Sequence, residues 1–183
     1  SEQEQQVMLN IKQTTTTNYV VGVGKIIPEN DIIQLSSPVN GIVQKIYKKE
    51  NDTVRIGSII LELEHQLEDG KIRLLNNELN TQAAQIKVDQ AGVAEFETKL
   101  SNAKSELLRL ENLLSKGAET QQTVDDATTN LKTLNANLKK LEATVNVSKS
   151  KWQETKTALN TAQLERDQKL IKSPINGRIL ELT

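Results

Sequence analysis

The chain has 183 residues, of which 36% are hydrophobic, 26% are charged and only 2% are aromatic. So few large side chains cannot fill a thick globular core, and we expect an elongated protein. The formal net charge of −1 indicates no basic surface for nucleic acid, and the lack of cysteine excludes a disulfide framework or a thiolate metal site.

No stretch of the chain reaches the roughly 18 consecutive apolar residues that span a bilayer. The first six residues also lack the basic start and apolar run of a signal peptide. We therefore expect any membrane anchor to lie outside this chain.

A short phrase occurs twice, as Ser-Pro-Val-Asn-Gly at residues 37–41 and as Ser-Pro-Ile-Asn-Gly at residues 173–177. Around the first copy, short β-rich runs at 32–35, 42–47 and 58–63 predict strands. Residues 170–182 repeat the pattern of strand, turn and strand. Because Asn and Gly both tolerate positive φ, the Asn-Gly pairs predict tight turns.

Between these ends, residues 65–169 change to the heptad spacing of a coiled coil. Each arm has one narrow apolar stripe that it cannot bury alone, so we expect the two arms to fold back on each other as a hairpin. Arms of roughly 50 residues would be about 75 Å long. The predicted seam comprises positions 75, 79, 82, 86, 89, 93, 96, 100, 103, 107, 110 and 114 on the first arm, and 124, 127, 131, 134, 138, 141, 145, 148, 152, 155, 159, 162 and 166 on the second.

The predicted tip of the hairpin lies near residues 116–120. Gly117 can adopt the left-handed conformation that ends a helix, and Lys116 complements the negative end of the helix dipole. Thr120 is a suitable N-cap for the returning helix. The sequence thus predicts a short, well-capped turn between the arms.

A few polar residues interrupt the seam, and we interpret them as fixing the register of the arms or loosening the base of the hairpin. They are Gln82, Asp89, Ser148, Thr155 and Arg166. Trp152 is interpreted as a packing anchor. His65 is the only histidine and stands near Glu62 and Glu64, too few ligands to predict a metal site. No Ser/His/Asp triad or Gly-rich phosphate loop can be assembled, so we expect a protein that is not an enzyme.

The β-rich ends resemble the two halves of a biotinyl/lipoyl-type domain. The resemblance rests on Gly41, Gly57 and the runs 50–54 and 60–63, with Asn51 where such domains usually have a glycine in the left-handed conformation. It implies an α+β fold, with a long antiparallel α-helical coiled-coil hairpin inserted into a split biotinyl/lipoyl-like β domain. Residues 28–64 would form the first half, 65–169 the hairpin and 170–183 the second half. No cofactor is implied, because the hairpin takes the turn that carries the modified lysine.

A split lipoyl domain with such a hairpin is similar to the HlyD-type membrane fusion proteins. That resemblance implies a periplasmic adaptor, anchored to the inner membrane by a segment absent from this chain, which links an inner-membrane ABC or RND transporter to an outer-membrane TolC-like channel. It implies export of drugs, small molecules or proteins, and self-association into a ring of six. Residues 1–27 would be a linker and strand leading to a β-barrel domain that is missing here.

Such adaptors often carry an Arg, a Leu, a Ser and an Asp around the tip, and this chain offers Arg109, Leu113, Thr120 and Asp125 at the same spacings. The resemblance implies that these residues contact the channel. Each also has a structural interpretation: Arg109 could pair with Glu106, Leu113 could pack in the core, Thr120 could cap the helix, and Asp125 could complement its dipole.

Two other functions fit the same pattern. The chain could be an accessory protein of a Gram-positive ABC exporter, with no outer membrane to reach. It could also be a biotin or lipoate carrier with an inserted hairpin, which the mass of the intact protein would reveal.

Overall fold

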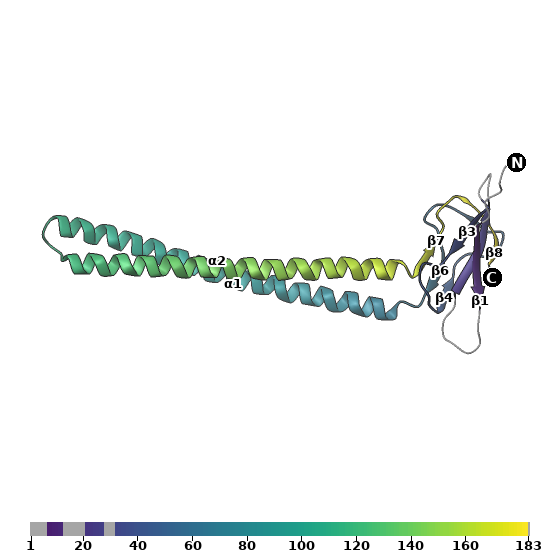
Figure 1. Ribbon diagram of the computed structural model, residues 1–183, viewed down its shortest axis with the longest axis horizontal. Coiled ribbons are helices and arrows are strands. Elements are labelled where there is room, and N and C mark those ends of the chain that lie inside the picture. The colour runs from purple at the N-terminus through teal and green to yellow at the C-terminus, as the bar shows by residue number, and fades with distance from the viewer. Residues whose placement is uncertain (1–6, 13–20, 28–31, 183) are drawn as a thin grey trace. The chain divides into compact units, whose positions relative to one another are not determined.

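The computed structural model describes residues 7–12, 21–27 and 32–182. The chain divides into two compact units. One unit combines the residues up to Arg73 with those from Asn160 onward, and the other is Leu74–Leu159. The fold is α+β, with two long helices between two sets of short strands, as predicted (Figure 1). The elements are β1 (Val7–Lys12), β2 (Val21–Ile27), β3 (Ile33–Ser36), β4 (Val43–Ile46), β5 (Thr53–Val54), β6 (Ile59–Leu63), α1 (Gln66–Ser115), α2 (Gln121–Asp167), β7 (Leu170–Lys172) and β8 (Gly177–Leu182).

A three-stranded sheet in the order β4-β6-β7 joins the two ends of the hairpin. The strands β6 and β7 run antiparallel, with Leu61 opposite Ile171 and Glu62 opposite Leu170. Because α1 and α2 lie between these strands in the sequence, the pairing brings the start and the end of the insertion together. The predicted closure of the split β module is confirmed.

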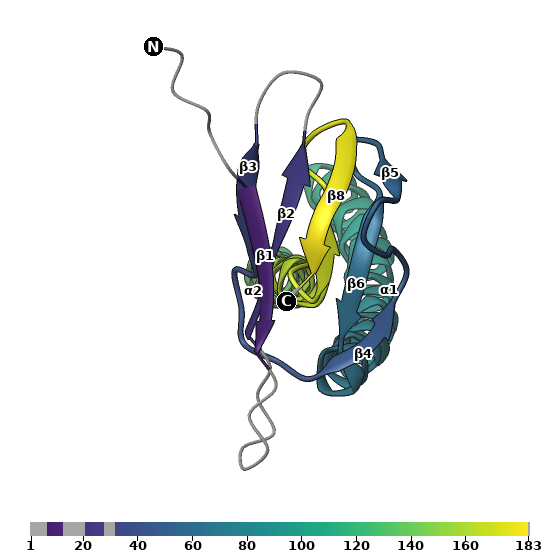
Figure 2. The same ribbon diagram turned by 90° about the vertical axis from the view of Figure 1, so that its right-hand side faces the viewer.

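A second sheet has five strands in the order β3-β2-β1-β8-β5. Its β8 pairs with β5 from the first half, and also with β2, where Ile26 lies opposite Ile179 (Figure 2). The sequence did not predict this role for β2. Of the segment interpreted as a linker and strand, residues 1–6 and 13–20 lie outside the described residues.

The core of the β unit draws on both halves of the chain. Val54, Ile60 and Leu61 from the first half are almost fully buried together with Ile171 and Ile179 from the second. Burying an isoleucine or leucine contributes about 1.5–3 kcal/mol. Because the core residues come from both halves, the core is complete only when the two halves pack together.

The repeated phrase forms the same local structure twice. The Ser37 hydroxyl donates to the carbonyl oxygen of Val39 at 2.5 Å, and the Ser173 hydroxyl donates to that of Ile175 at 2.6 Å. In each copy the backbone amide of the same residue, Val39 or Ile175, donates to the serine hydroxyl oxygen at 3.4 Å. The repeat therefore encodes a serine-based turn.

One detail of the predicted turns is wrong. Neither Asn40 nor Gly41 has a positive φ, and that conformation instead occurs at Asn51, with φ 70°, and at Gly57, with φ 83°. Glycine at position 41 avoids a tight contact, since a Cβ there would lie 3.2 Å from Cδ1 of Leu63. Asn51 does replace glycine at a left-handed turn, as its place in the lipoyl-like pattern predicted.

The hairpin helices bury the predicted seam. Every seam position on α1 and α2 is buried or half-buried, and the most deeply buried are Ala162, Val124, Leu110 and Val145. Figure 1 shows the two helices alongside each other up to the tip. Trp152 is half-buried in this seam, as expected of a packing anchor. Among the described helices, none has an apolar stretch long enough to cross a membrane.

Candidate functional site

The tip of the hairpin begins where α1 is closed by two backbone hydrogen bonds. The amide of Ala118 donates to the carbonyl of Leu113 and that of Gly117 to Leu114, both at 2.9 Å. Gly117 has φ 71°. This is a Schellman motif, which satisfies the last carbonyl groups of a helix and requires a left-handed residue. The predicted role of Gly117 is confirmed.

The return helix begins with a cap. The Thr123 amide donates to Oγ1 of Thr120 at 3.2 Å, and the two threonine hydroxyl oxygens lie 2.9 Å apart. A side-chain acceptor at this position satisfies an amide that has no partner within the helix. Thr120 is therefore the N-cap of α2, and it is exposed at the tip.

Arg109 is held by a neighbour on the same helix. Its Nε and Nη2 donate to the two carboxylate oxygens of Glu106, at 2.9 and 2.5 Å. This contact raises the pKa of Arg109 and lowers the pKa of Glu106. The side chain of Arg109 is nevertheless 61% exposed. The predicted pair with Glu106 is thus present, and it presents the guanidinium group in a defined orientation.

The other two predicted tip residues differ in exposure. Leu113 is half-buried, and its carbonyl takes part in the Schellman motif. Asp125 is exposed in the first turn of α2, where its Oδ1 accepts a hydrogen bond from Gln121 at 2.9 Å. All four predicted residues belong to the hairpin unit, and a role in partner binding stays a prediction for each of them.

Leu108 was missed by the sequence analysis. It lies next to Arg109, outside the seam, and is 69% exposed. The sequence could have indicated Leu108, because it is a leucine directly after seam position 107, where the heptad pattern predicts a polar residue. Arginine is enriched at protein interfaces, and the exposed leucine adds apolar surface next to it.

Four of the polar seam residues pair with each other across the hairpin. Gln82 Nε2 donates to Thr155 Oγ1 at 3.0 Å, and the Ser148 hydroxyl donates to Asp89 Oδ2 at 2.6 Å. The bond from Ser148 lowers the pKa of Asp89. Because a shifted register would separate these partners, the contacts support the interpretation that they fix the register.

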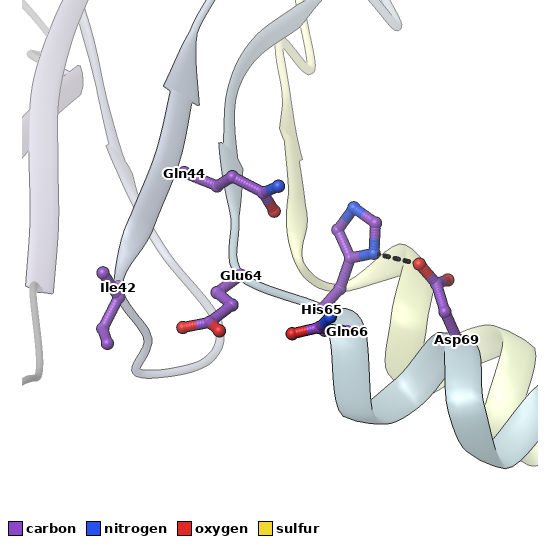
Figure 3. A pocket seen from close by; sticks show the side chains of 6 residues that line it. All are labelled: Ile42, Gln44, Glu64, His65, Gln66 and Asp69. Atoms are coloured by element: carbon purple, nitrogen blue, oxygen red, sulfur yellow. Dashed lines mark hydrogen bonds and ion pairs between the residues drawn. The ribbon is translucent and has the colours of Figure 1, made fainter.

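The fifth polar seam residue, Arg166, lies in the other unit, in a cluster around His65. Its Nε contacts Asp69 Oδ1 at 3.2 Å, while His65 Nδ1 meets Asp69 Oδ2 at 2.7 Å. Figure 3 shows His65 and Asp69 beside a pocket of about 390 Å³, which Gln44 and Glu64 also line. Within the described ranges, no three His, Cys, Asp or Glu side chains are grouped as metal ligands.

Comparisons with known proteins gave structural matches. No protein-family model matches the chain, and no curated protein matches it either. The chain is similar to MacA from Actinobacillus actinomycetemcomitans, with 26% identity over 92% of this chain and 47% of MacA, and a TM-score of 0.47. It therefore spans about half the length of MacA.

Two further structures are similar at lower identity. The periplasmic adaptor protein EmrA is 16% identical over 89% of this chain and 68% of its own, with a TM-score of 0.36. The soluble domain of LipC, a membrane fusion protein of a type I secretion system, is 10% identical over 79% and 89%, with a TM-score of 0.42. Because the TM-scores lie below 0.5, the fold rests on the sheets and helices described above.

Proposed function

We propose that this chain is the hairpin and lipoyl-like part of a periplasmic adaptor. The adaptor links an inner-membrane ABC or RND transporter to an outer-membrane TolC-like channel and serves the export of drugs, small molecules or proteins. The observation that carries the proposal is the hairpin itself: helices of 50 and 47 residues, joined by a short capped tip, are inserted between two strands that pair directly.

The physical argument concerns what such an insertion can do. At 1.5 Å per residue, helices of this length extend about 70–75 Å. Their contact surface is a narrow seam filled by their own side chains. A long paired rod suits a protein that spans a distance between two partners, and its end is the natural contact point.

The tip has the properties of a preformed docking surface. The Schellman motif and the Thr120 cap order the backbone before any partner arrives, which lowers the entropic cost of binding. Leu108 and Arg109 are exposed, and the guanidinium group is already oriented by Glu106. We propose that Arg109, Leu113, Thr120 and Asp125 contact the channel, with Leu108 as an added apolar contact.

The remaining parts follow from the same proposal. Residues 28–64 and 170–183 form the two lipoyl-like halves, residues 65–169 form the hairpin, and residues 1–27 lead toward a β-barrel domain. The complete protein works in the periplasm, is anchored to the inner membrane and assembles as a ring of six.

Export by the full-length protein tests the proposal. Arg109→Asp reverses the charge at the tip and is expected to abolish export, whereas Lys87→Asp, on an exposed position of the same helix away from the tip, is expected to preserve it. Circular dichroism should show the same helix content in both variants. Full export by the Arg109→Asp protein would refute the tip assignment, and capture of a TolC-like channel by the wild-type tip alone would support it.

A further inference from the structure

A chain of hydrogen-bonded polar groups connects the ends of two strands and two helices within the β unit. Tyr47, after β4, donates its hydroxyl to Glu62 Oε2 at 2.6 Å, and Glu62 Oε1 meets His65 Nε2 at 2.5 Å. His65 Nδ1 in turn contacts Asp69 in the first turn of α1, which is bound by Arg166 from the last turn of α2. All five residues belong to the same compact unit.

The geometry determines the protonation state of His65. Both ring nitrogens face a carboxylate oxygen, at 2.5 and 2.7 Å. A neutral imidazole has only one N–H, so one of its nitrogens would direct a lone pair at a negatively charged oxygen. Two donors are available only in the imidazolium form. His65 as a whole is only 9% exposed, so little water reaches its ring.

Among the groups in direct contact, Glu62, His65, Asp69 and Arg166, the charges balance only when His65 is protonated. Glu62 and Asp69 then face His65 and Arg166, and the loss of one proton leaves an unbalanced negative charge in a half-buried site. The titratable and charged groups around the ring are Glu62 and Glu64 at the end of β6, Asp69 on α1, Arg166 and its neighbour Asp167 on α2, and Tyr47 beyond Glu62.

We propose that His65 is a pH-sensitive clamp that holds the first turn of α1 to the end of β6 while both of its ring nitrogens carry a proton. Through Asp69 the clamp also positions the carboxylate that Arg166 contacts from the last turn of α2. As the pH rises, the ring loses one of its two protons and the clamp is released. The clamp would make the base of the hairpin respond to the acidity of the surrounding compartment. This property is separate from tip docking and does not depend on the adaptor function.

The direction of the effect follows from linkage. The contact with Glu62 raises the pKa of His65 above 6.5, even though burial opposes this, and the bond to Asp69 adds to the rise. The stabilisation is therefore complete below pH 6.5 and is lost as the pH rises through the folded-state pKa. Hydrogen bonds from Tyr47 and His65 lower the pKa of Glu62. Burial alone would raise the pKa of Asp69, but its hydrogen bonds with His65 and Arg166 outweigh burial, and the pKa of Asp69 is lowered. The carboxylates thus contribute until the pH falls through those lowered values.

The first experiment is a nitrogen-detected NMR titration of the unmodified chain, in which the single histidine makes the ring signals unambiguous. We expect both ring nitrogens to be protonated at pH 6 and the midpoint to lie above 6.5. In Glu62→Gln the midpoint should move back toward that value. A midpoint at or below 6.5 in the unmodified chain would overturn the proposal.

The second experiment measures release of the helix end. The Asp69 amide donates to the His65 carbonyl at 3.0 Å and reports on the first turn of α1. At pH values between the pKa of His65 in the unfolded chain and its pKa in the folded chain, the exchange protection of the Asp69 amide should fall by up to about tenfold per pH unit. The amide of Leu138, in the middle of α2, serves as the internal control and should show no such fall. His65→Gln should remove the pH dependence at Asp69, and a wild-type slope in that variant would contradict the clamp.

Discussion

Ser148 and Asp89 meet across the hairpin, where the serine hydroxyl donates to a carboxylate oxygen 2.6 Å away. The two residues lie 59 positions apart in the sequence and replace an apolar layer of the seam with a polar one. Since both helices must be in one register for this contact to form, the pair ties the position of one arm to that of the other.

Replacing only one residue of this pair should lower stability, whereas replacing both should not. Ser148→Ala leaves the Asp89 carboxylate in the seam without its cross-hairpin donor, so we expect a lower thermal midpoint. Asp89→Leu combined with Ser148→Ala makes the layer apolar and should restore or exceed the wild-type midpoint. Thermal unfolding followed by circular dichroism measures both. Equal midpoints for the wild type and Ser148→Ala would show that the contact is not stabilising.

Gln82 should behave differently, because its pairing is incomplete. Its Nε2 binds Thr155, but its buried Oε1 has no hydrogen-bond partner. Leaving a buried acceptor unpaired costs about 1–3 kcal/mol. Gln82→Leu together with Thr155→Val should therefore raise the free energy of unfolding, while Thr155→Val alone should lower it by about 1 kcal/mol. Chemical denaturation of the three proteins checks this, and a destabilised double variant would contradict it.

Two glycines make a matched test of packing. A Cβ at Gly41 would lie 3.2 and 3.3 Å from two carbons of Leu63, whereas one at Gly92 would have no neighbour within 4 Å. Because Leu63 is only 2% exposed, it has little room to move. Gly41→Ala should destabilise by about 1–3 kcal/mol, and Gly92→Ala, inside α1, should stabilise by about 0.5–1 kcal/mol. Chemical denaturation would contradict this if both changes had the same sign.

Thr120 allows capping to be separated from docking. Thr120→Ala removes the cap acceptor and should destabilise the hairpin by about 1 kcal/mol. Thr120→Asp keeps an acceptor at the cap, so the hairpin should keep its stability. If the hydroxyl contacts the channel, export by the full-length protein should nevertheless fall in Thr120→Asp. Normal export by that variant would limit Thr120 to the structural role.

The sequence alone was sufficient for the features that depend on local geometry. The heptad spacing identified every buried seam position, and the cap residues Gly117 and Thr120 marked both sides of the tip. Asn51 also has the left-handed conformation expected of it. Helix periodicity and preferred backbone conformations are properties of a few consecutive residues, so they can be read without knowing what the segment packs against.

Only the tertiary structure decided which distant groups meet. The pairing of β2 with β8, the space required at Gly41 and the cross-hairpin partners of Gln82 and Asp89 each depend on two segments far apart in the sequence. The same holds for Arg166, which contacts Asp69 from 97 positions further along the chain, whereas the two carboxylates at the His65 ring are near neighbours in the sequence. A one-dimensional pattern contains the chemistry of such groups but not their distances, which follow from how the chain closes on itself.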